Sequence, residues 1–250
     1  MWGLLAAFGF TARAATPNPK SGSTEQTVTV QASTSPIYRS IAQTYHVQGF
    51  TDLEGLRFTL NASGPHRKIE RHWEWWPGTG EVAYSGKDPN GQLLQDHYFR
   101  HRLLVGNAVL HQTIDRMFTS DTCWITFPFQ LVWDKNLRFR SLGHKPLPIP
   151  PGKADCLEVT STGGAYAPGD VFQLYYDPKD FLIKQWAVKR ASQPDAVEAY
   201  SWSEPSNVGP VLMSLDYQGS GERRVWISDI FVKFKGSDWQ SVEKLAIQLD

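Results

Sequence analysis

Apolar and polar residues alternate with a period of two along much of this 250-residue chain. Leu56, Phe58 and Leu60 are separated by polar residues. The segment 69–75 repeats the pattern, with tryptophans at alternate positions. Successive side chains of a strand point to opposite faces, so this period is typical of a strand that buries one face. A chain patterned in this way is expected to build a sheet.

Short turn sequences separate the alternating segments in the first half of the chain. Pro77-Gly78-Thr79-Gly80 and Asp88-Pro89-Asn90-Gly91 are both typical of tight turns. Further strands are expected over 82–84 and 93–99. Consecutive strands joined by short turns pair antiparallel, so this half predicts a meander.

Two segments have helical spacing instead. Ser35 suits an N-cap and Pro36 suits the first helical position, and the apolar residues of 37–45 recur every four residues. Apolar spacing within 103–119 predicts a second helix, which we expect to end at Asp121.

After the second helix the sequence predicts mainly strands. They are expected at 123–133, 138–142, 157–161, 171–176, 181–189, 196–202, 211–217 and 224–234. A proline-rich loop covers 145–152, and 239–249 are expected to form a short strand or helix. About ten to eleven strands with two helices, without alternation of strand and helix, predict a mainly β (α+β) fold with one curled antiparallel sheet. We assign 35–250 to a single domain.

The N-terminus has the pattern of a secretory signal. An apolar stretch, MWGLLAAFGF, is followed by a small-x-small triplet, which predicts cleavage after Ala14 or Ala15. We therefore expect a signal peptide at 1–15, a flexible leader at 16–34 and a periplasmic or secreted protein. A buried N-terminal helix is the alternative for the first segment. No window approaches the roughly 20 apolar residues of a transmembrane helix, so no membrane span is expected.

Export affects the interpretation of the two cysteines, Cys123 and Cys156. In an oxidising compartment they can form a disulfide, which would stabilise the fold by about 3 to 4 kcal/mol. Two buried free thiols are the alternative. The sequence leaves both open.

Charge and motifs exclude several functions. The chain has 25 basic and 25 acidic residues, a balance that argues against a nucleic-acid partner. Because the sequence contains no Gly-x-Ser-x-Gly elbow, no Ser-x-x-Lys set of catalytic motifs and no phosphate-binding loop, we expect neither an enzyme nor a cofactor. The alternative function is a secreted hydrolase or metal-dependent enzyme that uses His97 and His101 with acidic neighbours.

Aromatic residues are abundant, with 10 Trp, 9 Tyr and 13 Phe. Core packing accounts for most of them individually. A sheet of this many strands around only two helices is nevertheless expected to leave part of its concave face unfilled. An apolar hollow in an exported protein would suit a hydrophobic ligand.

Three stretches carry a resemblance to a known family. They are His72–Trp75 leading into Gly80–Tyr84, then Asp121–Phe129, and then Phe172–Pro178 before Phe181–Ile183. Together with the order of predicted elements, they resemble the periplasmic LolA/LolB-type lipoprotein-carrier superfamily, in an outer-membrane lipoprotein-sorting-like branch. The resemblance spans roughly 35–234.

The resemblance implies a half-open antiparallel β barrel with helices plugging its mouth and acyl chains held in its cavity. We therefore expect an exported, non-enzymatic binding or carrier protein for a lipid or a lipoprotein acyl chain, with a membrane-associated protein as a possible partner. The candidate lining residues come from one face of each strand: Leu56, Phe58, Leu60, Trp73, Trp75, Phe129 and Trp186. The carrier's cavity arginine has no counterpart that can be placed here, so lipoprotein, another amphiphile and a protein partner all stay open as cargo.

Overall fold

The computed structural model describes residues 36–65, 67–88, 91–103, 106 and 108–242. The predicted signal peptide and leader lie outside this range. The strands are β1 (Leu53–Gly64), β2 (Arg67–Trp76), β3 (Glu81–Lys87), β4 (Leu93–Phe99), β5 (Leu137–Pro146), β6 (Lys153–Ser161), β7 (Val171–Tyr176), β8 (Ile183–Lys189), β9 (Val197–Trp202), β10 (Ser206–Val208), β11 (Val211–Met213), β12 (Asp216–Gly219), β13 (Arg224–Phe234) and β14 (Gln240–Ser241). The helices are α1 (Pro36–Thr44), η1 (Val47–Asp52), η2 (Arg100–Arg102) and α2 (Ala108–Trp133).

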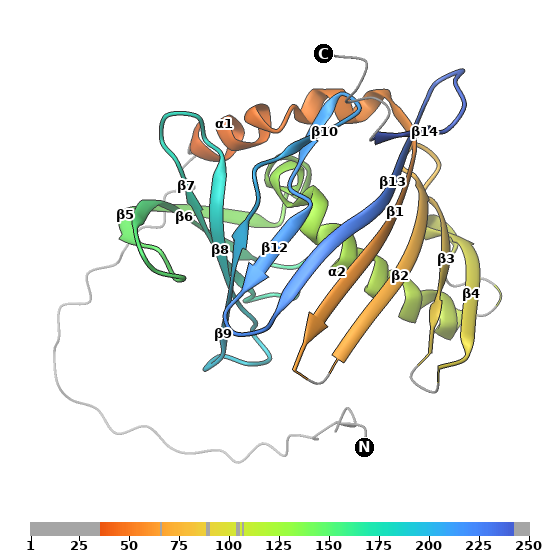
Figure 1. Ribbon diagram of the computed structural model, residues 1–250, viewed down its shortest axis with the longest axis horizontal. Coiled ribbons are helices and arrows are strands. Elements are labelled where there is room, and N and C mark those ends of the chain that lie inside the picture. The colour runs from red at the N-terminus through yellow and green to blue at the C-terminus, as the bar shows by residue number, and fades with distance from the viewer. Residues whose placement is uncertain (1–35, 66, 89–90, 104–105, 107, 243–250) are drawn as a thin grey trace, which may run out of the picture. The chain divides into compact units, whose positions relative to one another are not determined.

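Among the described residues, twelve strands form one antiparallel sheet that does not close (Figure 1). Its order is β4-β3-β2-β1-β13-β12-β9-β8-β7-β6-β5, with β14 paired to β13, and β10 and β11 form a separate ribbon. The predicted mainly β fold with an open antiparallel sheet is therefore confirmed. The number of strands exceeds the prediction, partly because the expected strand at 211–217 is divided into β11 and β12.

The sheet consists of two meanders, one of β1 to β4 and one of β5 to β9 with β12 and β13. They meet where β13 pairs with β1. Leu56 lies opposite Val232, and Leu60 lies opposite Ile227. These four residues are buried, since their strands turn the same apolar face inward. The pairing joins the first strands of the domain to the last long one.

The prediction for 123–133 is wrong: the segment is helical and continues α2, which does not end at Asp121. In this part of α2, buried side chains lie on nearly every side: Asp121, Thr122, Cys123, Ile125, Thr126, Phe127, Pro128, Phe129 and Leu131. A helix buried all round lacks the 3.6-residue apolar stripe that identifies a surface helix. Its aromatic and β-branched residues instead gave the segment the appearance of a strand.

Pro128 lies inside α2 and leaves one carbonyl without its helical partner. A proline has no N–H, so Pro128 cannot donate to the carbonyl of Trp124 four residues earlier. The hydroxyl of Tyr217, on β12, donates to this Trp124 carbonyl and also lies 2.6 Å from the carbonyl of Ser214. A residue from the sheet thus satisfies the carbonyl that Pro128 leaves free.

α2 packs against the concave face of the sheet and contacts both meanders. Phe118 packs against Trp73 of β2, with ring centroids 5.3 Å apart, and Phe127 packs against Phe172 of β7 at 4.7 Å. Asp121 accepts hydrogen bonds from Arg71 at 2.7 Å and from the indole of Trp73 at 2.9 Å. The main core therefore lies between α2 and the sheet.

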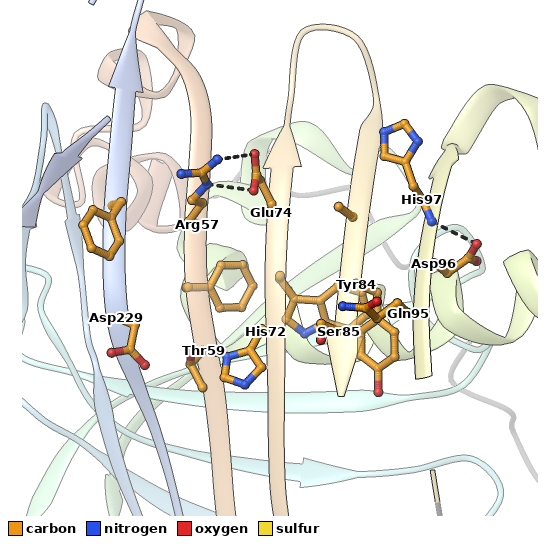
Figure 2. A pocket seen from close by; sticks show the side chains of 14 residues that line it. Arg57, Thr59, His72, Glu74, Tyr84, Ser85, Gln95, Asp96, His97 and Asp229 are labelled. Carbon is orange, nitrogen blue, oxygen red and sulfur yellow. Dashed lines mark hydrogen bonds and ion pairs between the residues drawn. The ribbon is translucent and has the colours of Figure 1, made fainter. Parts of the chain in front are cut away.

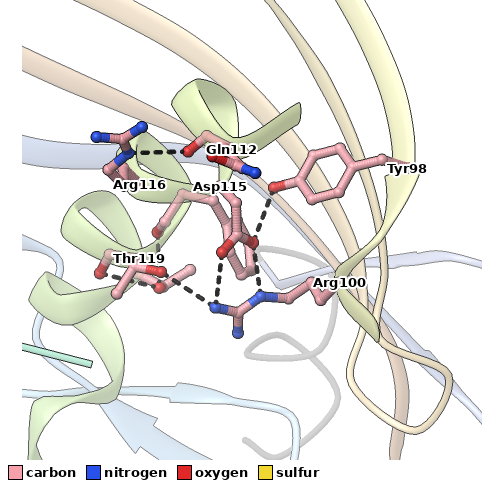
Figure 3. Close-up of polar contacts among 8 residues, drawn as sticks. Tyr98, Arg100, Gln112, Asp115, Arg116 and Thr119 are labelled. Atoms are coloured by element: carbon pink, nitrogen blue, oxygen red, sulfur yellow. Dashed lines mark hydrogen bonds and ion pairs between the residues drawn. The ribbon is translucent and has the colours of Figure 1, made fainter. Parts of the chain in front are cut away.

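The first half of α2 is also fixed to the edge strand β4 and to η2, which follows it directly (Figure 3). Asp115 of α2 accepts hydrogen bonds from the Arg100 guanidinium at 2.7 Å and from the Tyr98 hydroxyl at 3.2 Å. Burial raises the pKa of Tyr98 well above its usual value, which keeps its hydroxyl a donor.

In the described part of the chain, no helix combines the length and apolar character needed to cross a bilayer.

Candidate functional site

The seven residues predicted to line an apolar cavity lie in the main core. Trp75 is partly buried. The other six are at most 2% exposed: Leu56, Phe58, Leu60, Trp73, Phe129 and Trp186. Phe129 belongs to α2 and not to a strand. Since α2 packs across this face, an acyl chain could bind among these residues only if α2 moved. A ligand at these residues stays a prediction.

The free energy of such a displacement is unfavourable. Burying one large apolar side chain contributes about 1.5 to 3 kcal/mol. α2 buries six such side chains, so their burial contributes on the order of 10 kcal/mol: Ile114, Phe118, Ile125, Phe127, Phe129 and Leu131. An acyl chain of about twelve carbons gains about 0.8 kcal/mol per CH₂, a total of the same order. Burial of the acyl chain would therefore at best replace the burial free energy that α2 loses, and no free energy remains to drive the movement of α2. A hollow that a ligand can enter without moving α2 is the better candidate.

The opposite face of the sheet has such a hollow, which we call the outer trough. Its volume is about 700 Å³, and it crosses β13, β1, β2, β3 and β4 (Figure 2). Its lining residues are Arg57, Phe58, Thr59, His72, Trp73, Glu74, Ala83, Tyr84, Ser85, Gln95, Asp96, His97, Asp229 and Phe231. Hollows of this size are typical of small-molecule sites.

Strand alternation explains which side chains reach the outer trough. Phe58 and Trp73 are buried in the core beside α2. Their neighbours Arg57, His72 and Glu74 therefore point to the other face. The same alternation that builds the core also builds the polar part of the trough.

Two polar pairs connect β1 and β2 across the trough. Arg57 donates to Glu74 at 2.7 Å and also forms a second contact of 2.7 Å with the other carboxylate oxygen. The hydrogen bond and the ion-pair contact together hold both side chains in place. Thr59 is 3% exposed, and its hydroxyl lies 2.8 Å from Nδ1 of His72. These contacts fix the middle of the trough.

His97, at the β4 end of the trough, does not combine with His101 as the alternative function expected. Nε2 of His97 lies 2.6 Å from a carboxylate oxygen of Glu81. His101 lies in η2, after β4 has ended, with its ring 5.6 Å from that of Phe99. Within the described residues, no group of three or more His, Cys, Asp or Glu side chains could hold a metal ion.

A β-bulge in β13 forms the other end of the trough. Arg57 lies opposite Phe231 but Thr59 lies opposite Ser228, so β13 has one residue more than β1 here. Asp229, in this bulge, has a φ of 51°, in the left-handed region, which aspartate adopts more readily than most residues other than glycine. Bulges bend a strand and redirect its side chains. The bulge brings the Asp229 carboxylate to the trough (Figure 2).

The two cysteines are both free and buried. Cys123 lies in the main core, and Cys156 lies in a separate small cluster with Tyr175. Burial raises the pKa of each thiol to about 11. Of the two alternatives that the sequence left open, the structure contains free thiols.

Comparisons with known proteins find a likeness in structure but none in sequence. No family model matches the sequence, and no curated protein matches it. Among solved structures, the chain is similar to a DUF1329 family protein from Desulfovibrio piger, with a TM-score of 0.40 and 7% sequence identity. The alignment covers 81% of this chain and 95% of that one.

Proposed function

We propose that this protein is an exported, non-enzymatic binding or carrier protein for an amphiphile with an acyl chain or a similar apolar part. We place the ligand in the outer trough. One observation carries the proposal: the trough is a hollow of about 700 Å³ that exists without movement of any element. Export rests on the signal-like sequence at 1–15, so a periplasmic or secreted location belongs to the same proposal.

The lining suits a molecule with one apolar and one polar part. Phe231 is 37% exposed, which is high for so large an apolar side chain, and Ala83 leaves room above β3. Covering such surface contributes about 25 cal/mol per Å². Arg57, His72 and Asp229 offer polar groups at the same site. Pockets that combine apolar walls with a few fixed polar groups are the usual form of ligand sites.

The test is a variant that fills the trough. Ala83→Trp places a large ring in the hollow, and Val197→Trp, at a 62% exposed position on β9 outside the trough lining, is its matched control. We expect the purified protein to bind dodecyl maltoside in calorimetry. Ala83→Trp should weaken this binding by about tenfold or more, which is ~1.4 kcal/mol, and Val197→Trp should leave it unchanged.

Circular dichroism and thermal unfolding establish whether each variant is folded. A folded Ala83→Trp variant that binds as tightly as the unchanged protein would place the ligand outside the trough. Failure of the unchanged protein to bind any amphiphile would overturn the proposed function itself.

A further inference from the structure

We infer that the outer trough selects amphiphiles with a cationic, ammonium-type head, and that Asp229 binds this head. The inference rests on the proposed function for the presence of an amphiphile and adds its charge. It is argued from the charges of the trough, the conformation of Asp229 and the ring beside it.

The trough lining has more negative than positive charge. The carboxylates that face it are Glu74 and Asp229, and its permanent cation is Arg57. Alternation along β4 turns the Asp96 side chain to the core face, where it lies 3.5 Å from His111 of α2. Arg57 is already held by Glu74 through both of its carboxylate oxygens. An anionic head would therefore meet excess negative charge, and the guanidinium that could attract it is already paired.

Of these two carboxylates, Asp229 is the one placed to take a ligand, because Glu74 is already paired with Arg57. Asp229 accepts a hydrogen bond from the neutral Ser228 hydroxyl at 3.0 Å. Among the ion pairs of the described residues, Asp229 has no cationic partner.

The backbone at Asp229 supports a role in binding. Its φ of 51° costs free energy that a glycine at this position would avoid. Such conformations concentrate at functional sites, where they hold a side chain in a required direction. Here the bulge directs a carboxylate into a hollow.

An aromatic ring completes the site for an ammonium group. Phe231 follows Asp229 by two residues on β13 and lines the same trough. The face of an aromatic ring attracts cations, because the ring carries negative charge on its faces. A carboxylate and a ring together favour an organic cation over a neutral head, and a neutral head over an anion.

The experiment compares three amphiphiles with the same dodecyl chain: dodecyltrimethylammonium, dodecyl maltoside and dodecyl sulfate, each below its micelle concentration. We expect the ammonium compound to bind the purified protein about tenfold more tightly than the maltoside, and the sulfate to bind most weakly. Asp229→Asn should reduce the ratio of the two affinities, ammonium compound over maltoside, from about ten to about one. Asp195→Asn, an exposed acidic position outside the trough lining, is the matched control.

The outcomes separate the two proposals. If none of the three compounds binds, the proposed function fails. If the maltoside binds but the ammonium compound binds no more tightly, or if folded Asp229→Asn retains the preference for the cation, the protein remains an amphiphile binder and the inference about its head is overturned. A higher affinity for the sulfate overturns it as well.

Discussion

At the scale of single residues, the buried thiol of Cys123 links stability to pH. Its pKa is about 11 in the folded protein against an ordinary value of 9.0, because burial disfavours the thiolate. Between these values the unfolded chain loses the proton while the folded chain keeps it. The contribution of the protonated thiol is therefore complete below about pH 9 and is lost as the pH rises through about 11.

The Cys123→Ala variant isolates this effect. At pH 7 we expect the unchanged protein to have the larger free energy of unfolding, because alanine packs less well in the main core. As the pH rises from 9 to 10.5, the difference should shrink by about 1 kcal/mol per pH unit, since the variant has no thiol at this position to ionise. Urea unfolding at three pH values measures it.

Val225→Ala, which shortens another buried core residue, provides the comparison. Its difference from the unchanged protein should not depend on pH. A Cys123→Ala difference that is equally constant would show that the thiol does not carry the linkage.

At the scale of elements, α2 depends on the sheet for one of its own hydrogen bonds. The Tyr217 hydroxyl reaches the Trp124 carbonyl that Pro128 leaves without a helical donor. We expect Tyr217→Phe to reduce the free energy of unfolding by about 1 to 3 kcal/mol, because a buried carbonyl loses its partner. Chemical denaturation measures the loss.

A double-mutant cycle with Pro128→Ala tests the cause. Alanine supplies the missing N–H, so Tyr217→Phe should cost less in the Pro128→Ala background, with an interaction energy of about 0.5 kcal/mol or more. Additive effects of the two changes would mean that the hydroxyl serves mainly the nearby Ser214 carbonyl.

The same helix shows what local sequence patterns can and cannot predict. Alternation correctly predicted β1 to β4 and gave the bounds of β7 and β13, because these strands bury one face or follow clear turns. The segment 123–133 lacked a helical stripe because tertiary contacts bury it on nearly every side. The proline within it also argues against a helix unless a distant residue such as Tyr217 replaces the lost bond. No local pattern contains that residue.

At the scale of the whole domain, the position of the outer trough depends on a distant pairing. The trough forms where β13 joins β1 and carries the bulge at Asp229. Alternation in 56–75 did predict which side chains turn inward, and the structure buries most of them in the core. It did not predict that α2 would pack over that face. Nothing in the local sequence around His72 and Glu74 indicates that a hollow lies above them.

The two possible ligand locations make opposite predictions for hydrogen exchange in α2. A ligand in the outer trough leaves the packing of α2 against both meanders intact, so amides of 114–131 should keep their protection when dodecyl maltoside is bound. Amides of β13 near Asp229 should gain protection, because the ligand covers the bulge. A ligand among Leu56, Phe58 and the other core residues would have to displace α2 and expose its amides. Exchange measured with and without the amphiphile decides between them: loss of protection in α2 would contradict the outer trough and favour the interior, whereas protection confined to the strands around the bulge would support the trough.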